Sequence, residues 1–181
     1  MKKKRLSSYY IIFFLFLQVF GGLIGVSVYA DEEKQAVGIT DEQRSVIINH
    51  CDTIKDNLKS LQRTDSRARV YLGRYYETIL TDFITPLNLR LVENNITNTA
   101  LLENQTNFAA RRTRFSNDYI AYQQALEELV NMNCKSEPEK FYEKLVLTRE
   151  KRQMVNRDTK KMRELAAEQV RLVEELRNAT K

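Results

Sequence analysis

The sequence predicts an all-α protein, in which a long antiparallel helical hairpin and a third long helix form a coiled-coil-like three-helix bundle. Only two glycines, Gly38 and Gly73, and two prolines, Pro86 and Pro138, follow residue 30. Hairpin-rich β folds need such residues at many tight turns. Apolar residues instead recur at alternating intervals of three and four, which is the spacing of one face of a helix.

The first 30 residues have the pattern of an export signal. Lys2 to Arg5 precede an apolar run from Tyr9 to Ala30, and Val28-Tyr29-Ala30 supplies a signal-peptidase site. We therefore expect cleavage after Ala30 and an extracytoplasmic location, either secreted or in the periplasm or cell envelope. The alternative is an uncleaved anchor, because the run is 22 residues long and about 20 apolar residues suffice to cross a bilayer.

The export segment also carries most of the excess positive charge. Cleavage removes four of the 29 basic residues and none of the 24 acidic ones, so the formal net charge falls from +5 to +1. A basic domain is the usual electrostatic sign of nucleic-acid binding. Since the folded region is nearly neutral, we expect no nucleic-acid partner.

A polar linker over residues 31–39 is expected to lead into a helical domain over residues 40–181. Thr40-Asp41-Glu42-Gln43 fits a capping box, which predicts that a long helix starts there. Its apolar positions keep their phase through Asp65, so we expect one continuous helix, with a kink or short break at Pro86. These positions are Ile47, Cys51, Ile54, Leu58, Leu61, Ala68, Leu72, Tyr75 and Ile79.

The polar segment Asn-Asn-Ile-Thr-Asn-Thr at residues 94–99 predicts a chain reversal. Short polar side chains there compete with the helix for backbone hydrogen bonds. A second long helix is predicted beyond it. Its apolar stripe consists of Leu101, Phe108, Phe115, Tyr119, Tyr122, Leu126 and Leu129.

A third helix is predicted from Glu137 to about Arg177. Ser136-Glu137-Pro138-Glu139 combines a capping serine, a proline in the first turn and a glutamate three residues after the serine. Between Thr148 and Lys161 only Met154 and Val155 are apolar. We therefore expect the middle of this helix to be exposed to solvent.

Cys51 and Cys134 are the only two cysteines. Because disulfides persist in the compartments to which proteins are exported, we expect the two to form a disulfide. The midpoint between them lies just before residues 94–99, so folding the hairpin brings both to the same end. A bridge that closes so long a loop contributes about 4 to 5 kcal/mol in the chain-entropy model. The alternative is a pair of buried, unpaired thiols.

The cysteine pair also predicts a register for the hairpin, in which the numbers of facing residues add up to about 185. Arg112 then lies opposite Gly73. It stands between Phe108 and Phe115 on the apolar stripe, where a charge needs a partner or access to water. Glu77, one turn beyond Gly73, is the candidate partner, and the alternative is a bundle that frays at Arg112.

No catalytic residue, cofactor or metal is expected. His50 is the only histidine, which leaves a single imidazole for nucleophilic catalysis and few ligands for zinc. Ile47 stands where a helical di-iron motif would require glutamate, and a glycine-rich phosphate loop is missing. The basic stretches at residues 111–114 and 149–163 are typical of solvated helix faces.

The sequence therefore predicts an exported, non-enzymatic helical protein that binds a protein partner or itself through its helical faces. Tyrosine is common on surfaces that must be both apolar and wet. The tyrosines on the predicted stripes are Tyr71, Tyr75, Tyr76, Tyr119 and Tyr122. The alternative is a membrane-anchored helical scaffold or sensor, which would contact the membrane only through an uncleaved N-terminal span.

Overall fold

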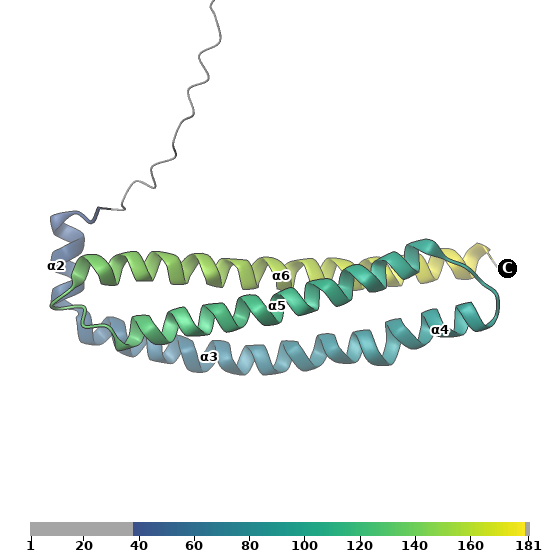
Figure 1. Ribbon diagram of the computed structural model, residues 1–181, viewed down its shortest axis with the longest axis horizontal. Helices are drawn as coiled ribbons and strands as arrows, with labels where there is room; N and C mark the ends of the chain where they lie inside the picture. Colours follow the sequence, from purple (N-terminus) through teal and green to yellow (C-terminus); the bar gives the residue numbers. More distant parts are fainter. Residues whose placement is uncertain (1–37, 180–181) are drawn as a thin grey trace, which may run out of the picture. The chain divides into compact units, whose positions relative to one another are not determined.

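The computed structural model describes residues 38–179, and these residues form helices and turns without any β-strand (Figure 1). The predicted all-α class is therefore confirmed. The predicted signal segment at residues 1–30 and most of the predicted linker at residues 31–39 lie outside the described residues.

Long helices run side by side in alternating directions. Helix α3 (Cys51–Thr78), the π-helix η1 (Ile79–Ile84) and helix α4 (Thr85–Glu93) follow one another as the first arm of a hairpin. Helix α5 (Thr99–Asn131) returns along this arm, and α6 (Pro138–Ala179) runs back along α5 (Figure 1). The predicted hairpin with a third long helix is thus confirmed, with α5 packed against both neighbours.

The first helix breaks at His50, where the sequence predicted that it would continue. Helix α2 (Asp41–Asn49) begins at the predicted capping box, in which the Gln43 amide donates to Thr40 Oγ1 at 3.1 Å and the Thr40 amide donates to Gln43 Oε1 at 2.9 Å. His50 then leaves helical geometry, with φ −111° and ψ 17°. The chain consequently turns between α2 and α3.

The turn at His50 lets α2 cross the end of the bundle (Figure 1). Arg44 of α2 pairs with Glu139 of α6 at 2.7 Å, and Gln43 Nε2 donates to the Tyr142 hydroxyl at 3.4 Å. The apolar side chain of Ile47 is buried in the same region. Contacts with α6 therefore outweigh the local preference for a straight helix, and periodicity alone does not reveal such contacts.

The expected irregularity near Pro86 takes the form of the π-helix that precedes it. The Thr85 amide donates to the Leu80 carbonyl, five residues back instead of four. Pro86 has no amide hydrogen to donate, and a wider turn just before it accommodates the lost bond without ending the helix. The inward positions Leu80, Ile84 and Asn88 all remain buried.

The chain reverses at the predicted polar segment. Asn95 has a φ of 58°, in the left-handed region that asparagine tolerates better than most residues. Asn98 then caps α5, because its Oδ1 accepts a hydrogen bond from the Leu101 amide at 3.1 Å. The short polar side chains that disfavour a helix at this point also supply the cap of the next one.

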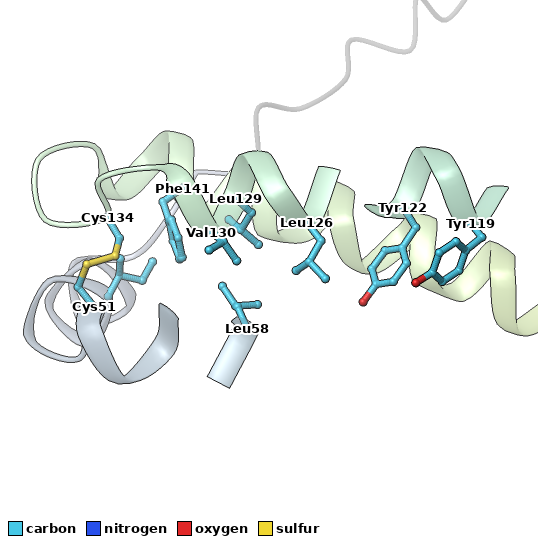
Figure 2. Packing of buried hydrophobic residues seen from close by; sticks show 10 residues of the cluster. Cys51, Leu58, Tyr119, Tyr122, Leu126, Leu129, Val130, Cys134 and Phe141 are labelled. Atoms are coloured by element: carbon cyan, nitrogen blue, oxygen red, sulfur yellow. A yellow bond between two sulfur atoms is a disulfide. The ribbon is translucent and has the colours of Figure 1, made fainter. Parts of the chain in front are cut away.

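The buried apolar residues fall into two clusters along the bundle. The first lies near the cysteines (Figure 2) and contains Ile47, Cys51, Leu58, Tyr119, Tyr122, Leu126, Leu129, Val130, Cys134 and Phe141. The second contains Tyr76, Leu80, Ile84, Phe108, Phe115, Met162 and Leu165. Val155 of α6 packs against both.

The middle of α6 is only partly exposed to solvent: residues such as Arg149 and Arg157 are exposed as predicted, but the inward side of the helix is covered. Thr148 and Asp158 are both buried. Thr148 keeps its hydroxyl satisfied within the helix, donating to the Lys144 carbonyl at 2.7 Å, and Asp158 pairs with Arg111 of α5. Polar side chains can be buried when they find such partners, and a stripe defined by apolar residues alone misses them.

Candidate functional site

The structure brings Cys51 and Cys134 together in a disulfide at one end of the bundle (Figure 2). Their Cα atoms are 5.7 Å apart, and both residues are buried. Cys51 begins α3, whereas Cys134 lies in the connection between α5 and α6. The bridge joins the first arm of the hairpin to the connection that leads into α6, and neither sulfur is available as a thiol nucleophile.

Charged contacts reinforce this end of the molecule. Lys55 Nζ donates to the Met132 carbonyl at 3.2 Å, and Lys135 pairs with Asp52 at 2.7 Å. The hydrogen bond from Lys135 lowers the pKa of the Asp52 carboxyl. The Lys135–Asp52 pair lies at the surface and the Lys55 hydrogen bond is partly buried, and both link the connection before α6 to the start of α3.

Arg112 and Glu77 also meet, with Arg112 Nη1 2.6 Å from Glu77 Oε2. The two side chains are 38% and 45% exposed, so they form a pair at the rim of the hairpin rather than inside it. Ser66 pairs with Tyr119 and Asp65 with Tyr122 in the same hairpin. These contacts follow the register expected from the cysteines to within about one helical turn.

Asp65 joins all three long helices. Its carboxylate accepts two hydrogen bonds from the Arg152 guanidinium of α6, at 2.7 and 3.1 Å, and one from the Tyr122 hydroxyl of α5, at 2.8 Å. Burial, followed by the hydrogen bond to Asp65, raises the pKa of the Tyr122 hydroxyl. The residue that interrupts the apolar stripe of α3 therefore serves as a structural junction.

A second polar cluster, which was not predicted from the sequence, surrounds Asp158. The side chain of Asp158 is only 2% exposed; its Oδ1 lies 2.8 Å from Arg111 Nη1 and 3.6 Å from Arg114 Nε. Asp158 stands three residues after Val155 and four before Met162, which is a core position of α6. A signal was thus present, namely an acid on the apolar stripe of the third helix.

Asp118 of α5 faces Asp158. Oδ2 of each carboxyl is buried and accepts no hydrogen bond from the described residues. Burial raises the pKa of the Asp158 carboxyl, Asp118 adds to the increase, and the hydrogen bond from Arg111 opposes it.

The outward face of α3 differs from these internal clusters, because large apolar side chains lie on it without cover from the described residues. Tyr71 is 70% exposed, Val70 55% and Tyr75 49%. The rings of Tyr71 and Tyr75 stack with centroids 6.3 Å apart and planes within 5° of parallel. We call the residues that line this shallow hollow of about 660 Å³ the α3 outer face: Ser66, Arg67, Val70, Tyr71, Arg74, Tyr75 and Thr78.

The α3 outer face is positively charged. Arg67 and Arg74 are exposed and make no ion pair within residues 38–179. The nearby acids on the same helix are already engaged, since Glu77 pairs with Arg112 and Asp65 with Arg152. The face therefore combines apolar area, two aromatic hydroxyls and two available guanidinium groups.

Comparisons with protein-family models, curated proteins and solved structures found no match. The chemistry of the chain must therefore be inferred from its own residues.

Among residues 38–179, three or more His, Cys, Asp or Glu side chains never gather as a potential metal site. His50 is exposed at the turn between α2 and α3. Over this range the helices are also too short or too polar to span a membrane.

Proposed function

We propose that this chain is an exported, non-enzymatic helical protein that binds a protein partner through the α3 outer face. The observation that carries the proposal is the exposure of Val70, Tyr71 and Tyr75 together around one hollow on a single helix, with the rings of Tyr71 and Tyr75 stacked. Contiguous exposed apolar area on a folded protein is typical of an interaction surface. Tyrosine and arginine are among the residues enriched at the energetic centres of such surfaces.

The proposed location outside the cytoplasm draws support from two features. The basic and apolar N-terminal segment has the pattern of an export signal. The Cys51–Cys134 disulfide is compatible with an oxidising compartment, where such bonds persist. If the N-terminal segment remains attached, it would hold the bundle at a membrane, as in an anchored scaffold or sensor.

A photo-crosslinking experiment in the native envelope tests the proposal. A photoreactive phenylalanine derivative replaces Tyr71 in one variant and Leu147 in a control, because Leu147 is also an exposed apolar residue but lies on α6. We expect a discrete crosslinked protein product at position 71 and none at position 147. Equal products at both positions, or none at position 71, would refute binding through the α3 outer face.

A further inference from the structure

The α3 outer face has the dimensions of a docking site for a single helix. It extends from Ser66 to Thr78 along α3, which is about 18 Å at 1.5 Å per residue. Its side chains come from one helix and recur at intervals of three and four. Such rows form the ridges and grooves into which a second helix packs.

The positive charges on the α3 outer face favour an acidic binding partner. Arg67 and Arg74 are seven residues apart, so they project from similar sides of α3 two turns from each other. Because both are free of acidic partners within residues 38–179, an occupant with carboxylates at the same spacing would complete two ion pairs. The hydroxyls of Tyr71 and Tyr75 add hydrogen-bond donors beside an apolar surface.

A second copy of this chain fits the face poorly. Most homodimers are two-fold symmetric, so the same patch meets itself. Such a contact would bring Arg67 and Arg74 against the equivalent arginines of the other copy. Like charges in an interface disfavour association, and the face lacks a free acid to offset them.

We infer that the partner presents an amphipathic helix to the α3 outer face, with an apolar stripe flanked by acidic residues about seven positions apart. This inference rests on the proposed function and specifies the class of partner. The apolar stripe packs over Val70, Tyr71 and Tyr75, and the acidic side chains pair with Arg67 and Arg74. Each ion pair lies at the rim, so it contributes more to selectivity than to affinity.

Two synthetic helical peptides provide the test. They share one apolar stripe of leucine and alanine, and they carry either glutamate or lysine at the flanking positions. Fluorescence anisotropy measures their binding to the exported protein. We expect the glutamate peptide to bind at least tenfold more tightly than the lysine peptide, with a preference that shrinks as salt is raised.

Matched variants test whether the preference for the glutamate peptide arises at the α3 outer face. Arg67→Glu with Arg74→Glu should reverse the order of the two peptides. Arg149→Glu with Arg157→Glu, which makes the same change in net charge at two exposed sites of α6, should leave the order unchanged. Tyr71→Ser with Tyr75→Ser should weaken both peptides at least tenfold, while thermal unfolding of every variant checks that the bundle remains folded.

Several results would overturn the inference. They are equal binding of the two peptides, binding of neither, or a stronger preference for vesicles of anionic phosphatidylglycerol than for the glutamate peptide. A dimer seen by light scattering that is lost in the Tyr71→Ser, Tyr75→Ser variant would assign the face to a second copy instead. A crosslink at position 71 without a preference for the glutamate peptide would leave the proposed function standing and remove only this partner class.

Discussion

Single polar residues determine much of how this bundle is held together. Asp65 and Asp158 both occupy inward positions, and each is matched by an arginine from another helix. Removing one member of such a pair leaves the other charge partly desolvated, which costs far more than the pair contributes over an apolar alternative. Charged pairs at the rim of the bundle, such as Arg112 with Glu77, remain hydrated and contribute little.

The contrast between a junction and a rim pair gives the first prediction. Asp65→Ala should lower the free energy of unfolding by about 2 to 3 kcal/mol, because Arg152 and Tyr122 lose their shared acceptor. Arg112→Ala should lower it by no more than about 1 kcal/mol. Urea unfolding followed by circular dichroism measures both, and equal losses would show that the rim pair matters as much as the junction.

The carboxyl of Asp158 should make stability depend on pH. Because burial raises its folded-state pKa above the ordinary 3.8, the folded protein binds this proton more tightly than the unfolded chain does. The resulting stabilisation is complete below about pH 3.8 and is lost as the pH rises through the folded-state pKa.

Asp158→Asn isolates that contribution, because the amide does not titrate. Relative to this variant, the wild-type protein should lose stability as the pH is raised from 4 to 7. Urea midpoints across that interval provide the measurement. A wild-type protein that instead gains stability over the variant on raising the pH would mean that Arg111 outweighs burial and that the pKa is lowered.

Helices in this molecule are positioned by a few specific contacts as well as by their apolar stripes. In the half of the bundle away from the disulfide, Asn104 of α5 donates to Gln169 Oε1 at 2.7 Å and to the Leu165 carbonyl at 3.1 Å, both in α6. Asn104 and Gln169 are buried. A buried polar pair tolerates few registers, because sliding one helix leaves both groups unsatisfied.

Replacing only Asn104 should destabilise the bundle, whereas replacing both members of the pair should not. Asn104→Leu alone should cost about 1 to 3 kcal/mol, because Gln169 is left buried without its donor. Adding Gln169→Leu should restore stability to near the wild-type value. A double-mutant cycle from urea unfolding measures the coupling, and additive losses would contradict a direct role for the pair.

The disulfide links two elements covalently, because it ties the start of α3 to the connection before α6. Cys51→Ser with Cys134→Ser should lower the free energy of unfolding by about 4 kcal/mol, because the unfolded chain regains the freedom of a long loop. Thermal unfolding of the variant and of the oxidised protein provides the comparison. Two alkylatable thiols in the unreduced exported protein would contradict the bridge.

At the scale of the bundle over residues 38–179, the two sides of α3 differ in exposure. The inner stripes of α3, α5 and α6 are buried against one another, whereas the α3 outer face keeps its tyrosines in solvent. Since folding of the bundle does not cover this face, its apolar area remains available for binding energy. The proposed partner helix would use that area while the disulfide and polar junctions hold α3 in place.

At the scale of the whole molecule, the prediction concerns the N-terminal residue of the exported chain. Mass spectrometry of the protein recovered from its native compartment should give a chain that begins at Asp31, as expected for cleavage after Ala30. Retention of residues 1–30 would instead support the anchored scaffold or sensor.

Much of the fold followed from local physics. Few helix breakers, a capping box at Thr40 and apolar residues at intervals of three and four predicted long helices, because these features act within a turn or two of the chain. The positions of Cys51 and Cys134 about the polar reversal predicted which helix ends meet. The approximate register then placed Arg112 near Glu77, as the structure does.

Contacts between helices determined the features that local sequence patterns do not predict. The turn at His50 arises because α2 packs across α6, and Asp158 in the middle of α6 is buried because it meets Arg111 from another helix. Exposure of Tyr71 beside a buried Tyr76 likewise depends on which side of α3 the bundle covers. A side chain's own sequence neighbours determine its helix, but its burial and its partners depend on residues that only folding brings within a few ångströms.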